Sequence, residues 1–182
     1  MTNVMTIANF FIDFANNSDE EKMTNARINK LLYFAQGWSL ARSGRPLFKA
    51  AIQAWPYGPV VPTVYNKLKK YKDESILATV GEYTPNSFST SELSLLIDVM
   101  NYYGKYPTSK LITMTHENDT PWKKVYKEHC SNVIDQDSIR NYFLTKKPLK
   151  SLTKDYTHRE YVGIIDKNNH VILPTEMDDG WN

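Results

Sequence analysis

Hydrophobic positions recur with the spacing of α-helices over most of this chain. Over residues 6–16 the apolar side chains cover most of a helical surface, which predicts a well-buried first helix. A second, longer helix is predicted from the N-cap Thr24 to about Ser43, where Gly44 ends it. Its middle, residues 31–35, is apolar on every side. We therefore expect this helix to have neighbours on more than one face.

The next segment is dominated by proline and aromatic residues. A short extended segment is predicted at residues 51–55, and residues 54–65 read Ala-Trp-Pro-Tyr-Gly-Pro-Val-Val-Pro-Thr-Val-Tyr. Each proline restricts its own φ and biases the preceding residue toward extended conformations, so this segment is predicted to be a rigid apolar turn. Pro62 suits the first turn of a third helix that reaches Tyr71. Residues 72–88 are predicted to be a loop.

The second half of the helical region carries clear start signals. Ser89 and Glu92 match a capping box, which predicts a buried helix to about residue 103. Beyond Pro107, residues 109–115 form a short apolar helix pattern. Thr120 followed by proline predicts a helix over residues 122–130, and Asp135 can cap a last helix over residues 136–146.

The tail beyond Pro148 changes to a β pattern. Two β-prone runs, residues 161–165 and 170–174, flank a four-residue polar turn and predict a hairpin, and the last residues from 175 are expected to be mobile. An isolated hairpin is marginal in water, so this one is expected to pack on the helical body or on a partner. The prediction is a mainly α fold: one compact domain of about six to seven helices over residues 1–150, with residues 151–182 as a β-hairpin tail packed on it.

Composition narrows the function classes. The chain has 182 residues, of which 41% are hydrophobic and 23% charged, as in ordinary globular domains. No run approaches eighteen apolar residues and the N-terminus lacks signal-peptide features, so a cytoplasmic location is expected. The single Cys130 can form neither an internal disulfide nor a multi-thiolate metal site. A net charge of +2 is too small for a dedicated nucleic-acid binder.

Residues suited to catalysis are sparse. His116 and Asp119 could share a helix face, but a zinc hydrolase motif would need a second histidine there, and Thr120 and Pro121 favour a structural role at a helix start. Cys130 follows His129 directly, and adjacent residues on a helix cannot pair as nucleophile and base. Glycines are too scattered for a phosphate-binding loop. We therefore predict no enzyme activity, no metal and no cofactor.

Two basic clusters remain to be weighed. Lys67, Lys69, Lys70 and Lys72 are interleaved with tyrosines, and Lys123, Lys124 and Lys127 form a second group. Such clusters could hold a phosphate backbone, but a solvated helix face is the commoner role in a chain of balanced charge. Basic clusters also recruit acidic proteins.

Three segments together resemble a known family. They are residues 30–41 followed by 45–48, then residues 54–65, then residues 111–117 with Pro121, Trp122 and Tyr126. Their order and spacing resemble the Panacea domain, also called the SocA-like antitoxin family and described earlier as phage-associated GepA-like proteins. The resemblance covers about residues 5–146, and the Trp-Pro-Tyr-Gly-Pro-Val core makes it specific.

The resemblance implies a mainly helical, non-enzymatic protein of bacteria and prophages whose gene is paired with that of a toxin. Toxins of the family include small alarmone synthetases and other translation or membrane inhibitors. Family members act by binding the toxin directly or, in the SocA case, by delivering it to the ClpXP protease. We expect a toxin–antitoxin function by direct protein–protein interaction; the alternatives are a proteolytic adaptor and a phage-encoded regulatory protein.

Contacts to the toxin are expected at the proline-rich turn and the helix after it. Framework residues shared among antitoxins of unlike toxins should hold the fold, and Trp55, Trp38 and Tyr33 are as well suited to the core as to a contact. The tail hairpin is a second choice for the contact. The predicted partner-binding residues are Tyr57, Val60, Tyr65, Lys69, Lys70 and, as a second choice, Trp122.

Overall fold

The computed structural model describes residues 1–18, 21–81, 83–84, 87–150, 164–165 and 171–172. By its internal contacts the chain divides into two units, Met1–Lys150 and Ser151–Asn182. The described residues contain seven α-helices and two short two-stranded sheets, so the predicted mainly α fold is confirmed.

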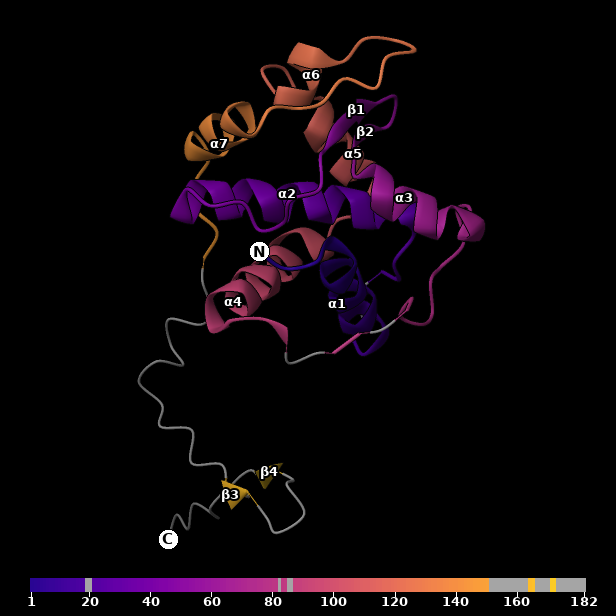
Figure 1. The fold of residues 1–182 in the computed structure, drawn as a ribbon, viewed down its shortest axis with the longest axis vertical. Coiled ribbons are helices and arrows are strands. Elements are labelled where there is room, and N and C mark those ends of the chain that lie inside the picture. Colours follow the sequence, from indigo (N-terminus) through magenta and orange to yellow (C-terminus); the bar gives the residue numbers. More distant parts are fainter. Residues whose placement is uncertain (19–20, 82, 85–86, 151–163, 166–170, 173–182) are drawn as a thin grey trace, which may run out of the picture. The chain divides into compact units, whose positions relative to one another are not determined.

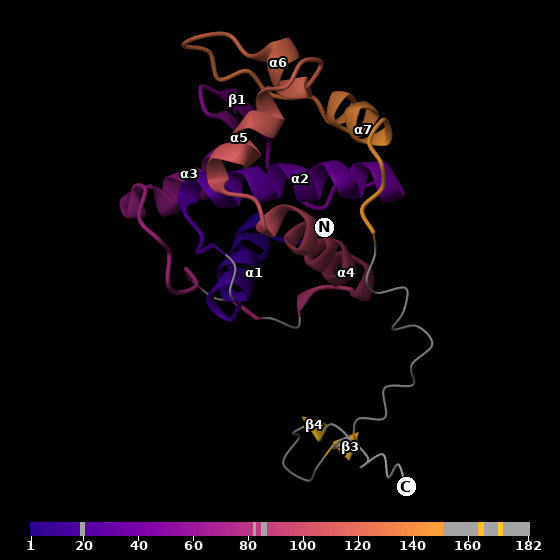
Figure 2. The ribbon, with the colours of Figure 1, turned by 180° about the vertical axis from the view of Figure 1, so that it is seen from behind.

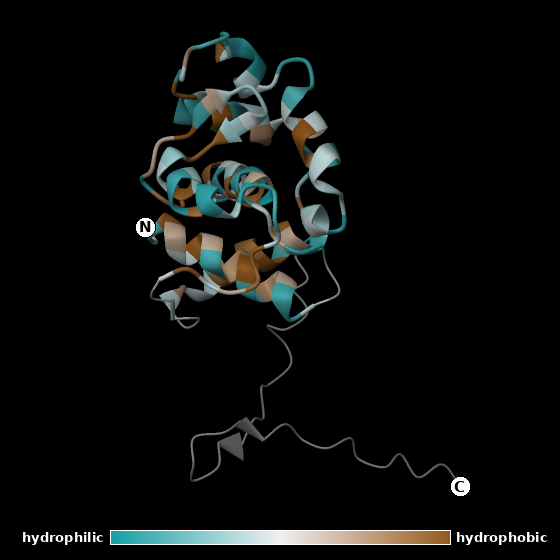
Figure 3. Cartoon of the chain, turned by 90° about the vertical axis from the view of Figure 1, so that its right-hand side faces the viewer, coloured by the Kyte–Doolittle hydropathy of each residue, from teal (hydrophilic) through white to brown (hydrophobic). Residues whose placement is uncertain are grey.

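Helix α2 (Asn25–Ser43) runs through the middle of the first unit. It contacts α1 (Val4–Asn16) and α4 (Thr90–Val99) on one side, and α3 (Pro62–Leu68), α5 (Thr108–His116) and α7 (Gln136–Leu144) on the other (Figures 1 and 2). Figure 3 views α2 nearly end-on, with the other helices around it. Fifteen of its 19 residues are buried, so this helix has no solvent-facing stripe, as its sequence predicted.

The ends of α2 follow from local residues. The Thr24 side chain accepts a 3.2 Å hydrogen bond from the backbone N–H of Arg27, and Gly44 ends the helix with φ of +67°. Within the helix, a Cβ on Gly37 would lie 2.2 Å from the ring of Phe143. The glycine therefore lets α7 pack directly on the backbone of α2.

Other helix starts were also predicted correctly, whereas one helix is shorter than predicted. The Ser89–Glu92 capping box begins α4, which continues as one π-helical segment, η3 (Met100–Gly104). Helix α6 (Pro121–Val125) begins after Thr120 but ends well before the predicted residue 130. Asn132 explains the early end, because its amide donates to the Val125 carbonyl at 2.7 Å and its own carbonyl accepts from the Ala54 N–H at 2.8 Å. The chain therefore turns back to a distant segment.

The proline-rich turn is a β-hairpin. Strand β1 (Gln53–Trp55) pairs antiparallel with β2 (Gly58–Val60), with Trp55 opposite Gly58. Gln53 also bridges to Val133 on its other side. Helix α3 follows and ends in a single 3₁₀ turn, η1 (Lys69–Tyr71), so the third helix stops where it was predicted. No α-helix or strand occurs among the described part of residues 72–88.

The second unit contains the predicted tail hairpin. Strand β3 (Ile164–Ile165) pairs antiparallel with β4 (Val171–Ile172), which confirms the strand pairing at these four residues. The other positions of the two predicted strands, and the end of the chain from residue 173, lie outside the described residues. Packing of this hairpin on the helical unit stays a prediction.

Candidate functional site

The tip of the β1–β2 hairpin exposes one large aromatic side chain. Pro56 and Tyr57 connect the two strands, and the proline sets the backbone for the first turn position. Gly58 has φ of +100°, which returns the chain into β2 and is strained for any other residue. The side chain of Tyr57 is 76% exposed. Local sequence therefore builds a short, rigid turn that presents a tyrosine to solvent.

Polar side chains buried on α2 hold this hairpin from below. Asn29 accepts from the backbone N–H of Val61 at 2.8 Å, and the Lys30 amine donates to the Pro59 carbonyl at 2.9 Å. Asn25 donates to the Tyr65 carbonyl at 3.1 Å and is itself bonded by Asn29 at 2.9 Å. A proline-rich segment cannot satisfy all of its backbone groups through its own ladder, so α2 supplies the missing partners. These residues were not predicted from the sequence. Asn25 and Asn29, a polar pair four positions apart in an apolar helix, were a signal of buried polar contacts.

Lys30 is the most unusual of these groups. Its side chain is 1% exposed and its hydrogen-bond acceptor is a carbonyl, not a carboxylate. Burial disfavours the ammonium form and lowers the pKa of Lys30 to about 7. The amine lies directly under Gly58, where a Cβ would meet Lys30 Cε at 2.9 Å.

Lys30 predicts a pH dependence of stability. Because the folded pKa of about 7 lies below the unfolded value of 10.5, the unfolded chain binds more protons between these values. The destabilising effect of Lys30 is fully present below pH 7 and is relieved as pH rises, by at most about 1.4 kcal/mol per pH unit. We expect this part of the rise in the free energy of unfolding with pH to vanish in Lys30→Met. Urea unfolding at several pH values across this window measures it, with exposed Lys49→Met as the control. Equal pH slopes in wild type and Lys30→Met would contradict the assignment.

Aromatic side chains from three helices surround the hairpin. Trp55 lies edge-to-face with Tyr65 of α3, with ring centroids 4.8 Å apart. Trp122 of α6 donates its indole N–H to the Trp55 carbonyl at 2.9 Å and stacks on Tyr126 at 4.5 Å. We call the two exposed turn residues, together with three half-buried rings around them, the hairpin surface. It consists of Pro56, Tyr57, Tyr65, His116 and Tyr126.

His116 belongs to the hairpin surface, where both ring nitrogens lie against backbone carbonyl oxygens. Its Nδ1 lies 2.7 Å from the Ile112 carbonyl oxygen and its Nε2 lies 3.2 Å from that of Pro56. The ring also packs on Trp122, with centroids 3.8 Å apart. Asp119 instead adopts φ of +66° in the turn before α6. Among the described residues, no three His, Cys, Asp or Glu side chains are grouped as metal ligands would be.

The structure separates the six predicted contact residues into two groups. Tyr57, Lys69 and Lys70 are exposed and Tyr65 is half-buried, so these four are accessible, and their role in binding stays a prediction. Val60 is 6% exposed and Trp122 is 3% exposed. Both pack inward, since Val60 ends strand β2 against the body and Trp122 supports Trp55. Val60 and Trp122 therefore support the fold and offer little surface for contact with a partner.

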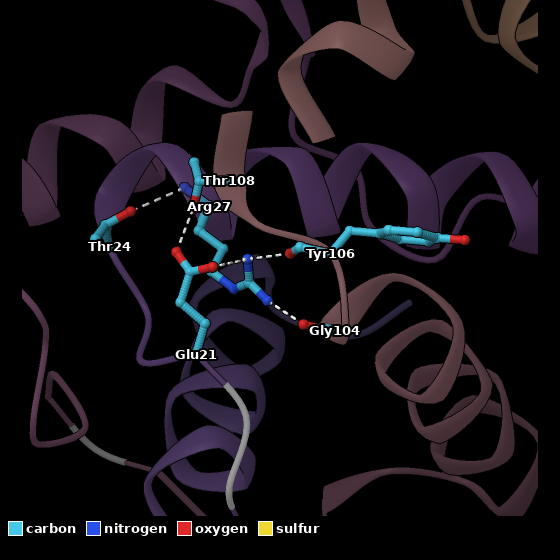
Figure 4. Close-up of polar contacts among 6 residues, drawn as sticks. All are labelled: Glu21, Thr24, Arg27, Gly104, Tyr106 and Thr108. Carbon is cyan, nitrogen blue, oxygen red and sulfur yellow. Dashed lines mark hydrogen bonds and ion pairs between the residues drawn. The ribbon is translucent and has the colours of Figure 1, made fainter. Parts of the chain in front are cut away.

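A second buried polar cluster, also missed from sequence, lies at the start of α2 (Figure 4). The fully buried Arg27 donates to the Tyr106 carbonyl at 2.8 Å, to the Gly104 carbonyl, and to Glu21 at 3.2 Å. Glu21 in turn accepts from the Thr108 hydroxyl at 2.9 Å. One guanidinium therefore joins α2 to the end of η3 and the start of α5. This fixes α5, which carries His116 to the hairpin.

A groove elsewhere on the protein offers fewer free side chains for binding. A groove of about 730 Å³ lies between the end of α2 and the start of α4, and Arg42, Glu92 and Arg45 are among its lining residues. Arg42 is paired with the buried Asp98 at 2.8 Å, and Glu92 closes the capping box. Two charged side chains that line the groove, Arg42 and Glu92, are thus already engaged in contacts within the protein. Within the described part of the chain, no helix combines the length and apolar character needed to cross a membrane.

Comparison with known proteins agrees with the motifs at the hairpin. The family described as "Antitoxin SocA-like, Panacea domain" matches residues 28–123, more than half of the chain and the part that contains most of α2, the hairpin and the start of α6. The chain is similar to "Antitoxin SocA" of Caulobacter vibrioides (strain NA1000 / CB15N), with 28% identity over 129 residues. That alignment covers 64% of this chain and 66% of the relative, just under two thirds of its length. No solved structure matches the chain. The chain therefore belongs to the SocA-like antitoxin family defined by the Panacea domain.

Proposed function

We propose that this protein neutralises a cognate protein toxin by binding it directly, with the hairpin surface as the contact. The observation that carries the proposal is Tyr57, an exposed aromatic side chain held on a rigid turn within the family-defining segment. Tyrosine is enriched among the residues that dominate binding energy. A preformed turn loses little conformational entropy when a partner binds.

The arrangement favours binding over catalysis. The buried polar side chains Asn25, Asn29 and Lys30 below the hairpin all contact backbone groups, so their role is to position the hairpin and the start of α3. The proposal places this activity in the cytoplasm, as the composition predicted. The expected toxin is a small alarmone synthetase or another translation inhibitor, as the family resemblance implies.

The direct test uses the gene adjacent to that of this protein. Its product is expressed in a bacterial host with and without this chain, and growth is followed. We expect growth arrest by the neighbour alone and rescue by co-expression, including in a host that lacks ClpXP. Rescue only when the protease is present would show delivery to the protease in place of direct neutralisation. Absence of any rescue of a toxic neighbour would refute the antitoxin proposal for this gene pair.

Tyr57→Ala is expected to weaken the complex about 30-fold or more, the loss typical of a residue that contributes about 2 kcal/mol at an interface. Isothermal titration calorimetry with the purified neighbour measures this loss. Leu77→Ala is the matched control, because Leu77 is 72% exposed and lies outside the hairpin surface. An affinity of Tyr57→Ala equal to that of the control would move the contact elsewhere.

A further inference from the structure

Two lysine groups lie next to the hairpin surface. Residues 62–72 contain four lysines and no acidic residue, and residues 121–127 contain three lysines and no acidic residue. All seven side chains are exposed, and none takes part in an ion pair in the part of the chain that the structure describes. The seven are Lys67, Lys69, Lys70, Lys72, Lys123, Lys124 and Lys127.

Tertiary structure brings the segments that carry these groups to one hairpin. The first group follows Tyr65, which packs on the ring of Trp55. The second group surrounds Tyr126 and follows Trp122, whose indole binds the Trp55 carbonyl. The hairpin lies beside both α3 and α6 in Figures 1 and 2. The segments that carry the two lysine groups therefore meet at one hairpin, although they are more than fifty residues apart in sequence.

Acidic residues border the two groups without neutralising them. Glu117 pairs with Lys146 at 3.9 Å, and Glu128 lies 3.6 Å from His129. Asp73 and Glu74 follow the first lysine group, and Asp119 precedes the second. None of these carboxylates is paired with a lysine of either group in the described residues. Lysines held close together repel one another. Such an arrangement favours an oppositely charged partner.

We infer that the toxin presents an acidic rim around an apolar recess, which receives the ring of Tyr57 while the two lysine groups contact the rim. This inference rests on the proposed function and specifies its partner surface. Complementary charge steers encounter and selects among partners, and a central aromatic residue contributes most of the short-range binding energy. The polar framework below the hairpin then holds the turn in place, and the lysines determine which toxin is bound.

The same lysines fit a nucleic acid less well. Single-stranded nucleic acids are bound on platforms of several accessible aromatic rings. Here only Tyr57 is exposed among the aromatic residues at the hairpin, because Trp122 is buried and Trp55, Tyr65 and Tyr126 are half-buried. Both groups contain lysine alone, whereas arginine provides the planar, bidentate contact to phosphate. An acidic protein surface accounts for both features.

Association rates measured by surface plasmon resonance test the inference, with the product of the adjacent gene as the probe. We expect the wild-type association rate to fall about tenfold between about 50 and about 300 mM salt. Lys69→Glu/Lys70→Glu and Lys123→Glu/Lys124→Glu should each slow association about tenfold at the lower salt. Lys147→Glu/Lys150→Glu carries the same charge change at exposed positions outside both groups and should stay within about twofold of wild type. Thermal unfolding of each variant checks that the exposed substitutions leave the fold intact.

The possible outcomes distinguish a failure of the acidic-rim inference from a failure of the proposed antitoxin function. If the neighbour is bound and neutralised but all three double variants behave alike, the acidic-rim inference is overturned and the antitoxin function stands. If wild-type protein neither binds nor neutralises a toxic neighbour, both fall together. A single-stranded RNA of about 20 nucleotides serves as competitor. If that RNA binds through the same lysines and displaces the toxin, a nucleic-acid surface replaces the acidic rim.

Discussion

Replacing Arg27 with methionine is expected to lower the free energy of unfolding by about 3–5 kcal/mol. The guanidinium donates to the carbonyls of Gly104 and Tyr106, which are buried and half-buried. Each carbonyl left without a donor costs about 1–3 kcal/mol, and methionine fills the vacated volume only in part. Urea unfolding followed by circular dichroism measures the loss. We expect the folded state to retain its helices and the transition to move to lower urea.

Two further variants make this result specific to the contacts of Arg27. Arg45→Met changes the same residue type at an exposed position and should stay within about 0.5 kcal/mol of wild type. Arg27→Lys keeps the charge but lacks the planar fork that reaches several acceptors, so an intermediate loss is expected. If Arg27→Met were as stable as Arg45→Met, the link between α2 and the η3–α5 connection would have no energetic role.

Gly58→Ala is expected to destabilise the protein by about 3 kcal/mol and to abolish toxin binding. With φ of +100°, the position strains any residue that carries a Cβ, at about 1–2 kcal/mol. The new methyl group would also lie 2.6 Å from Thr115 Oγ1 and 2.9 Å from Lys30 Cε. Overpacking of this kind costs about 1–3 kcal/mol more. Relief of the clash would lift the hairpin away from α2 and displace Tyr57.

Gly44→Ala is the matched control for this variant. Gly44 also has positive φ, at +67°, but a Cβ there meets nothing within 4 Å. Its replacement should therefore show backbone strain alone, about 1–2 kcal/mol, and leave toxin binding unchanged. Chemical unfolding and titration with the purified neighbour are run on both variants. Equal losses in the two would mean that the packing of Lys30 and Thr115 against Gly58 does not hold the hairpin.

Helix starts and stops were readable from sequence because they depend on residues within one turn of the chain. The Ser89 and Thr24 caps accept hydrogen bonds from N–H groups three residues ahead, and Gly44 adopts a φ that other residues avoid. The end of α6 was predicted wrongly for the converse reason. It depends on Asn132, which joins the end of α6 to Ala54, 78 residues earlier.

The candidate site was only partly accessible to the same reasoning. The motif around Trp55 identified the proline-rich segment. Tyr57 of this segment is exposed, and its role in binding stays a prediction. Val60 and Trp122 could not be told from surface residues, because burial depends on which segments pack on them. The polar residues of α2 were missed because a helix that looks apolar on every side gives no reason to expect buried Asn29 and Lys30. Their partners are backbone atoms of the hairpin, which no pattern along the chain identifies.

By itself the sequence determined the helical class of this protein, most helix starts, and the antitoxin family, because these reside in local periodicity, capping and a contiguous motif. The tertiary structure alone decided that the motif is a hairpin braced by polar groups of α2, and that the segments carrying the two lysine groups both contact Trp55 of this hairpin. Those features require contacts between segments tens of residues apart. Such contacts form only when the whole core is assembled.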